Sequence, residues 1–220
     1  MSPYSKTINW DKTRLDSTSR IWELYHENSK QTPFDLFPNT DEIKIWKNEL
    51  SLQIPFATNY NQRLIKTEKI PKDNLVLKSI LKHSFDGLAD AICPIEILIH
   101  LPSNHGGQCG LYHFNPENNQ LMIINHQISP QLSNTEITIL ATCFFEKLTT
   151  PYGERGYRNA LLMGGRVLQN LLLAARVDNR ELNIKEIYMD REIEDYLKID
   201  GINHSLIAVG TIPYTDNNKL

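Results

Sequence analysis

In the stretch Tyr152-Gly-Glu-Arg-Gly-Tyr-Arg158, which continues as Asn159-Ala-Leu-Leu-Met-Gly-Gly-Arg-Val-Leu-Gln-Asn-Leu-Leu-Leu-Ala-Ala175, a polar, arginine-rich segment runs directly into an apolar one. The polar segment predicts a loop over residues 151–158. In the apolar segment, large aliphatic residues recur close to the helical repeat, which predicts a buried helix over residues 155–176.

Two adjacent glycines, Gly164 and Gly165, lie inside this predicted helix. Each costs about 1 kcal/mol relative to alanine in a helix interior. A cost of that size indicates that something packs closely against the backbone there. We favour tight helix–helix packing, in a core or a dimer interface, and contact with a planar ligand is the alternative.

Composition limits the classes of protein to consider. A chain of 220 residues, 40% of them hydrophobic, can bury one substantial core. The formal net charge of -3 gives no electrostatic reason to expect nucleic-acid binding. No apolar run reaches membrane-spanning length, because Pro94 and Glu96 interrupt the run Ile92–Leu101. We therefore expect neither nucleic acid nor a membrane among the partners.

The cysteines and the N-terminus indicate the compartment. Three cysteines form no even disulfide framework and no CxxC pair, so reduced thiols are expected. The N-terminal residues, which include Trp10, Asp11 and Lys12, lack the apolar segment of a secretory signal. We expect a cytoplasmic enzyme or enzyme subunit.

The chain divides into an N-terminal arm over residues 1–60, which is broken by prolines, and one domain over residues 61–220. Hydrophobic periodicity and turn signals predict helices and strands in the domain. The predicted helices cover residues 71–81, 155–176 and 191–198, and the predicted strands cover 95–101, 110–114, 120–124, 137–145 and 206–210. Helices that alternate with mostly non-consecutive strands indicate a mixed α/β or α+β sandwich.

The stretch from Tyr152 to Ala175 also resembles the SagB-type dehydrogenases, the azoline oxidases of the nitroreductase superfamily. These enzymes act in thiazole/oxazole-modified peptide pathways. Weaker similarity extends to other parts of the family's pattern. The matching segments are Tyr25-His-Glu-Asn-Ser-Lys30, Pro94-Ile-Glu-Ile-Leu-Ile99, Gly110-Leu-Tyr-His-Phe-Asn-Pro116, Asp200-Gly201 and Ala208-Val-Gly210.

The resemblance implies a fold and a cofactor. The fold is α+β, a nitroreductase-like three-layer α/β/α sandwich with a mostly antiparallel mixed sheet and dimerising helices. The cofactor is FMN, which such proteins hold at a dimer interface. The protein's own contribution to flavin chemistry is mainly position and electrostatics.

Azoline oxidation also needs a base within hydrogen-bond reach of the proton that leaves the substrate. The resemblance assigns that task to an adjacent Lys-Tyr pair. In this chain the tyrosine is Tyr152, which we take as the candidate catalytic residue, but Pro151 stands in the lysine position. The ordinary pKa of tyrosine is about 10, so Tyr152 alone is a poor base, and a structural role in the loop is the alternative. Lys147 lies too near the predicted strand end to be taken as a replacement for the lysine.

Other positions of the family's pattern are altered. Leu88-Ala-Asp90 stands where a Ser-Gly-Gly turn lets the backbone approach the flavin, and Glu186-Ile187 stands where a Gly-Gly pair does. The arginine cluster that grips the phosphate is reduced to Arg63, and Lys219 is the remaining candidate for the C-terminal phosphate ligand. The resemblance thus implies the family's architecture with part of its active site lost.

Four further residues are candidate cofactor contacts. Arg155 and Arg158 can pair with flavin phosphate, or with Glu154 or a neighbouring strand. Gln169 and Asn170 can reach a ligand from the predicted helix, or form an inter-helix hydrogen bond. Zinc binding by His105, Cys109 and His113 is a weaker alternative, because the glycines around them predict a loop that runs into a hairpin. We therefore predict no metal site.

Three hypotheses follow. In the first, the chain is a subunit of an FMN-dependent, SagB-like azoline dehydrogenase that modifies a ribosomal precursor peptide, and it pairs with a homologous subunit. In the second, it is a non-catalytic, flavin-free scaffold that binds the peptide or partner enzymes. In the third, it is a homodimeric flavoenzyme with altered contacts and another redox substrate.

Overall fold

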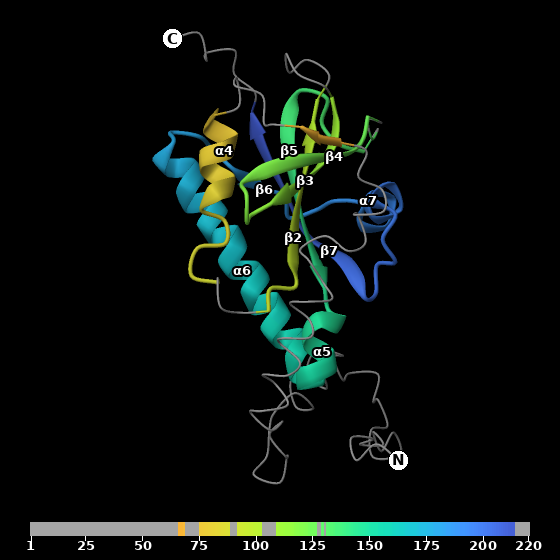
Figure 1. The fold of residues 1–220 in the computed structure, drawn as a ribbon. Helices are drawn as coiled ribbons and strands as arrows, with labels where there is room; N and C mark the ends of the chain where they lie inside the picture. The colour runs from red at the N-terminus through yellow and green to blue at the C-terminus, as the bar shows by residue number, and fades with distance from the viewer. Residues whose placement is uncertain are drawn as a thin grey trace, which may run out of the picture. The chain divides into compact units, whose positions relative to one another are not determined.

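The computed structural model describes residues 66–68, 75–88, 92–102, 109–126, 129 and 131–213, all within one compact unit. The predicted arm over residues 1–60 lies outside these residues, as does Arg63. Figure 1 shows the described elements around a central sheet.

In the described part of the chain, seven strands form one sheet in the order β1-β4-β3-β2-β5-β7-β6. Every neighbouring pair in it is antiparallel. The strands are β1 (Lys66–Glu68), β2 (Ile95–Leu101), β3 (Gly110–Asn115), β4 (Gln120–Asn125), β5 (Glu136–Phe144), β6 (Asn183–Ile184) and β7 (His204–Pro213). The predicted hairpin is confirmed as β3 and β4, and its turn ends at Asn119, whose φ is 52°.

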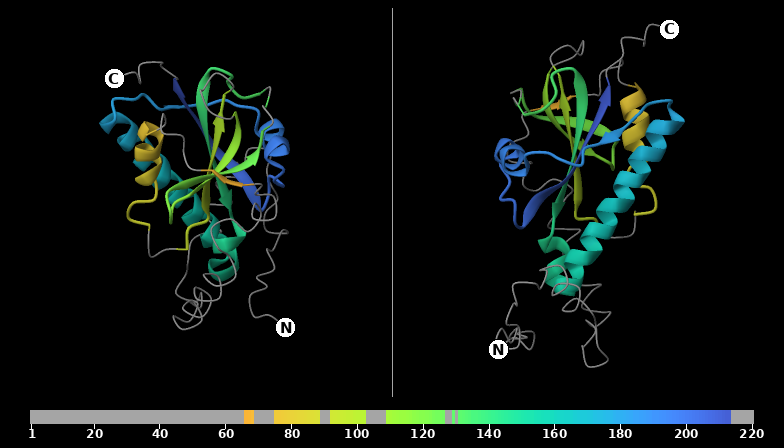
Figure 2. Two further views of the ribbon diagram at one scale, coloured as in Figure 1. Left: turned by 45° about the horizontal axis from the view of Figure 1, so that its top comes forward. Right: turned by 180° about the vertical axis from the view of Figure 1, so that it is seen from behind.

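The helices cover both faces of the sheet. They are α4 (Leu75–Lys82), α5 (Glu146–Tyr152), α6 (Glu154–Val177) and α7 (Asp190–Leu197). The views in Figure 2 place α4 and α6 on one face, which we call the α6 face, and α7 on the other, the α7 face. The predicted three-layer α+β sandwich is therefore confirmed.

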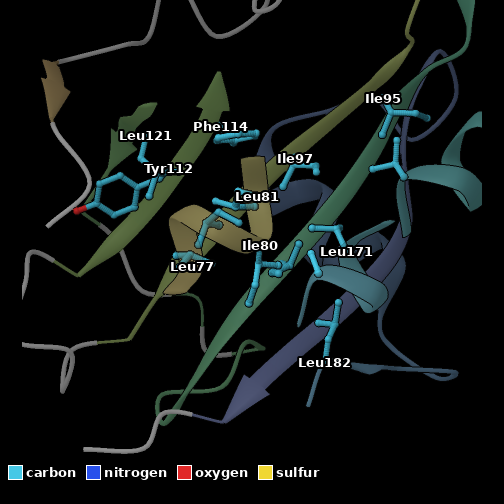
Figure 3. Packing of buried hydrophobic residues seen from close by; sticks show 14 of the residues in the cluster. Leu77, Ile80, Leu81, Ile95, Ile97, Tyr112, Phe114, Leu121, Leu171 and Leu182 are labelled. Atoms are coloured by element: carbon cyan, nitrogen blue, oxygen red, sulfur yellow. The ribbon is translucent and has the colours of Figure 1, made fainter. Parts of the chain in front are cut away.

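Alternation along β2 shows how the faces are divided, because successive side chains of a strand point to opposite sides. Ile95, Ile97 and Ile99 join the core under α4 and α6, whereas Leu98 joins the smaller core under α7. Figure 3 shows Ile95 and Ile97 in the larger core. All seven residues of β2 are buried, as expected for a central strand covered on both faces.

Helix α6 packs on the sheet through a stripe at helical spacing. Ala160, Val167, Leu171 and Ala175 are fully buried along it. Among the described residues, α6 is the one helix long and apolar enough to cross a membrane, by length and composition alone. One side of the helix belongs to the core of the sandwich, and the window that meets this test is 33% buried.

The packing partner of Gly164 differs from the prediction. A Cβ atom at Gly164 would lie 2.6 Å from Cδ1 of Ile207 on β7 and 3.5 Å from Cδ1 of Ile95 on β2. The sheet, and not a second helix, therefore approaches the helix backbone at this point. A Cβ at Gly165 would have no atom within 4 Å, so the described chain gives no packing reason for this second glycine.

The predicted loop over residues 151–158 is wrong. Helix α5 extends to Tyr152 and α6 begins at Glu154, so Gly153 alone separates the two helices, with φ 56° and ψ −143°. This φ is one that glycine adopts without a steric cost. Gly156 makes the tight connection possible, because a Cβ there would clash with the backbone of Leu148.

Candidate functional site

Three of the predicted site residues lie at the junction of α5 and α6. Tyr152 is the last residue of α5, half-buried against the core of the α6 face. Arg155 and Arg158 are half-buried in the first turns of α6. The rings of Phe145 and Tyr157 pack at this junction with centroids 4.5 Å apart. The structure thus places the predicted base and the two predicted phosphate contacts in one region.

The other two predicted cofactor contacts lie farther along α6. At 1.5 Å per residue, Gln169 is about 16 Å along the helix axis from Arg158. Gln169 is exposed, and Nδ2 of Asn170 donates to the backbone oxygens of Ser84 and Asp86, both at 3.1 Å. Asn170 therefore ties α6 to the turn that follows α4. The ligand roles predicted for these residues stay predictions.

The altered positions of the family pattern do not form a flavin cradle within the described residues. Leu88 is buried in the core of the α6 face, and Ala89 and Asp90 lie outside the described residues. Glu186 and Ile187 are exposed in the segment before α7. The candidate FMN contacts thus lie at the junction of α5 and α6 and about 16 Å farther along α6. These described residues do not by themselves form a site that fits the whole cofactor.

A second group of polar side chains gathers on the α7 face, and we call it the buried polar cluster: Glu96, His113, Thr142, Lys147 and His204. The residues come from β2, β3, β5, α5 and β7, and each of them is buried. Nε2 of His204 lies 2.9 Å from Oγ1 of Thr142 and 3.4 Å from Oε2 of Glu96. The sheet register explains why Glu96 and Thr142 both lie near His204, because Glu96 on β2 lies directly opposite Thr142 on β5.

Lys147 reaches this cluster from the first turn of α5. Its Nζ lies 5.8 Å from the ring centroid of Phe144, a distance at which an ammonium and an aromatic face attract. Its charge acts on the pKa values of Glu96, His113 and His204. The prediction set Lys147 aside because it lies close to the end of a strand, yet the helix turns its side chain back towards the sheet.

Burial sets the charges in the cluster. It raises the pKa of Glu96 to about 7, an effect that the charge of Lys147 partly opposes. Burial also lowers the pKa of His113 and of His204 to about 4, and Lys147 adds to both shifts. At neutral pH both imidazoles are therefore uncharged, and the contact between His204 and Glu96 is not an ion pair. A carboxyl group with a pKa near 7 can accept and release a proton at working pH.

Sequence reasoning missed this cluster as a site. Glu96 appeared in it as part of a strand motif that interrupts an apolar run, and His113 as part of a hairpin motif and a candidate zinc ligand. Thr142 and His204 did not appear at all. A usable signal was present, since Glu96 and His113 are ionisable residues inside otherwise apolar strands. Such residues are rarely buried without a partner or a function.

The described residues contain no group of three or more His, Cys, Asp or Glu side chains placed to hold a metal ion. Of the residues considered for zinc, Cys109 is half-buried immediately before β3 and His113 is buried within that strand. His105 lies outside the described residues.

Comparison with known proteins extends these observations. No family model matches the chain. The chain is 27% identical over 134 residues to the Methanocaldococcus jannaschii protein named Putative nitroreductase MJ1384, a match that covers 56% of this chain and 67% of that protein.

Two solved structures share the architecture. The first is a chain of the E. coli microcin synthetase McbBCD complex with truncated pro-MccB17 bound, with a TM-score of 0.56 and 17% identity over 94% of this chain and 86% of that one. The second is a structure from Anabaena variabilis, also named as a putative nitroreductase, with a TM-score of 0.62 and 20% identity over 86% of this chain. This chain covers 45% of the Anabaena chain, less than half of its length.

These matches and the three-layer sandwich define the class of protein: the chain has the nitroreductase-like fold. Its sequence is similar to that of a protein named as a putative nitroreductase, and its architecture is similar to that of a chain of the microcin synthetase McbBCD complex.

Proposed function

We propose that this chain is a cytoplasmic subunit of an FMN-dependent, SagB-like dehydrogenase that oxidises azolines to azoles during the maturation of a ribosomal peptide. It shares a flavin site with a homologous nitroreductase-like subunit, or with a second copy of itself. When bound, FMN would accept the hydride from the azoline ring. The alternative is a flavin-free, non-catalytic subunit that binds the precursor peptide within the same kind of complex.

The observation that carries the proposal is the likeness to the microcin synthetase chain. It extends over 94% of this chain and 86% of that chain, so the two share a whole architecture and not an isolated motif. That complex was solved with a truncated precursor peptide bound. The resemblance of the Tyr152–Ala175 stretch to the SagB-type dehydrogenases supports the same class of reaction from an independent source.

The solvent-facing side of α6 supports a partner subunit. It carries large apolar side chains, of which Leu162 is 64% exposed, and the others are Tyr157, Leu161, Leu173 and Val177. Gly165 lies on this side, and a methyl group added there would have no atom within 4 Å, although a helix glycine costs about 1 kcal/mol relative to alanine. A partner packed against Gly165 would account for that cost and for the exposed apolar surface.

A shared flavin site agrees with the position of the predicted contacts. Tyr152, Arg155 and Arg158 lie together where α5 meets α6, at one end of the apolar side of α6. From there Arg155 and Arg158 would hold the flavin phosphate of a site completed by the partner. Proton transfer would fall to Tyr152 or to Glu96, whose pKa of about 7 suits neutral conditions.

The flavin-free alternative is favoured by two residues. Pro151 stands inside α5 at the position of the family's lysine, and it offers no proton-accepting group. Leu88 is buried in the core, so its backbone is covered where the family's glycines approach the flavin.

Expression of the chain alone and together with a homologous subunit tests the proposal. We expect a colourless protein alone and a yellow complex with flavin absorbance after co-expression. A colourless complex that still binds the precursor peptide would support the scaffold instead. A yellow homodimer would support an independent flavoenzyme.

Arg158→Ala in the co-expressed complex tests the shared site more finely. We expect lower flavin retention per complex after gel filtration, because an arginine–phosphate contact is lost. Arg191→Ala, at an exposed position on α7, is the matched control and should retain the flavin. Equal flavin retention in both variants would show that Arg158 does not contact the flavin phosphate.

A further inference from the structure

A row of buried polar side chains crosses three neighbouring strands on the α7 face, away from the buried polar cluster. His100 on β2 lies directly opposite Thr138 on β5, and Thr138 lies opposite Thr211 on β7. The three residues are 0%, 1% and 3% exposed. Residues opposite each other in antiparallel strands point to the same face, so the three side chains form a continuous polar row.

None of the side-chain nitrogen and oxygen atoms in this row has a hydrogen-bond partner within the described part of the chain. They are Nδ1 and Nε2 of His100, Oγ1 of Thr138 and Oγ1 of Thr211. A buried polar group without a partner costs a substantial part of a domain's small net stability, and this row contains three such residues. Valine has the shape of threonine without the hydroxyl group, so an apolar row would avoid the cost.

The chemistry of the row limits what can satisfy it. Burial lowers the pKa of His100, so its imidazole is uncharged at neutral pH and offers one donor and one acceptor. Each threonine hydroxyl adds one donor and acceptor lone pairs. The ring of Tyr196 on α7 lies edge-on to that of His100, with the two ring centroids 6.4 Å apart. The row itself presents no formal charge, so it does not select an ion.

We propose that the row His100–Thr138–Thr211 is a buried binding site for an uncharged guest that both donates and accepts hydrogen bonds. The amide group of a small ligand has this chemistry, and so does bound water. Neighbouring strands are about 4.8 Å apart, so the row spans about 10 Å and presents hydrogen-bonding groups at three positions along that length. This site is independent of the proposed dehydrogenase function.

Substitution by valine tests whether the row is occupied. If a guest bridges the hydroxyls, Thr138→Val and Thr211→Val each lose hydrogen bonds and should lower the Tm by about 2–4 °C or more. Thr142→Val is the matched control with a known partner, since it loses the contact to His204 and should show a loss of similar size. Unchanged or higher Tm values for Thr138→Val and Thr211→Val would overturn the proposal, because removal of an unpaired hydroxyl is stabilising.

Two measurements on the intact chain then identify the guest. Native mass spectrometry detects an organic ligand as a mass excess that the valine variants lose. Nuclear Overhauser contacts between water and the amides of residues 138 and 211 detect long-lived bound water. Either result supports the proposal and names the source. If both measurements are negative, the proposal fails, even if the valine variants are less stable.

Discussion

The two faces of the sheet are built by the same strands, but they bury different chemistry. On the α6 face, β2 contributes Ile95, Ile97 and Ile99 to a continuous apolar core. On the α7 face, the same strand contributes Glu96, Leu98 and His100, so ionisable side chains alternate with an apolar one. The α6 face of this strand is therefore wholly apolar, whereas its α7 face combines a smaller apolar core with buried ionisable groups.

The difference has an energetic meaning. Apolar burial stabilises the fold by roughly 25 cal/mol per Å², whereas a buried carboxyl or imidazole must be partnered or lose its charge. The pKa of Glu96 is raised and the pKa of His204 is lowered, and both shifts favour the uncharged form of the side chain. Because the α6 face supplies the stabilising core, the α7 face can carry these costly groups.

The largest expected effect is on the α6 face. Leu171→Ala removes a fully buried side chain from α6 and should lower the free energy of unfolding by about 2–5 kcal/mol. Leu173→Ala, two residues along the same helix and 49% exposed, should change it by less than about 0.5 kcal/mol in the isolated chain. Chemical denaturation of both variants measures the contrast. Similar losses would mean that the packing of α6 is assigned incorrectly.

The next largest effect is a loss of folding stability at higher pH, and it arises from Glu96. Its pKa is raised in the fold, so its contribution to stability is fully present below about pH 4.5 and is lost as the pH rises through about 7. By about pH 8 this loss amounts to about 3 kcal/mol. Glu96→Gln is uncharged at every pH and should gain stability relative to wild type between about pH 5 and pH 8. Parallel denaturation curves over that range would show that Glu96 is not buried as described.

At lower pH, His204 is expected to cost about 2 kcal/mol of the free energy of unfolding. Its pKa is lowered to about 4 in the fold, so its contribution is present above about pH 6.5 and is lost as the pH falls through 4. His204→Gln should reduce the loss of stability between about pH 7 and pH 5 by about 2 kcal/mol, and the similarly buried His113 should account for much of the remainder. Chemical denaturation of wild type and His204→Gln at pH 7 and at pH 5 measures the change, and an equal loss in both proteins would contradict this assignment.

The smallest effect is at Gly165, on the solvent side of α6. Gly165→Ala should stabilise the isolated chain by about 0.5–1 kcal/mol, because no atom lies within 4 Å of the added methyl group. If a partner packs against this glycine, the same change should weaken co-purification with the homologous subunit. Arg191→Ala on α7 is the control and should keep the partner. Undiminished co-purification of Gly165→Ala would move the interface away from this part of α6.

Much of the fold could be predicted from local patterns. The apolar period along residues 155–176 predicted α6 within one residue at each end, and the turn residues between Asn115 and Asn119 predicted the hairpin. The break between α5 and α6 was not predictable in the same way. It depends on the left-handed φ of Gly153 and on the close approach of Gly156 to Leu148, and neither appears in a hydrophobic pattern.

The candidate site was less predictable for the same reason. The sequence pointed to Tyr152, Arg155 and Arg158, which are neighbours in the chain and lie in one region of the fold. It did not point to the contact between His204 and Thr142, which are separated by 62 positions. Only the pairing of β5 with β7 brings these two residues together.

The amino-acid sequence by itself determined most of the longer helices and strands, such as α6 and the hairpin of β3 and β4, because periodicity and turn motifs are properties of neighbouring residues. It also carried the likeness to a flavoenzyme family. The tertiary structure alone decided which side of each strand faces which helix, and therefore that Lys147, Glu96 and His204 share one buried environment. Their pKa shifts follow from burial and from charges on other strands and helices, and these are set by packing across the whole sheet.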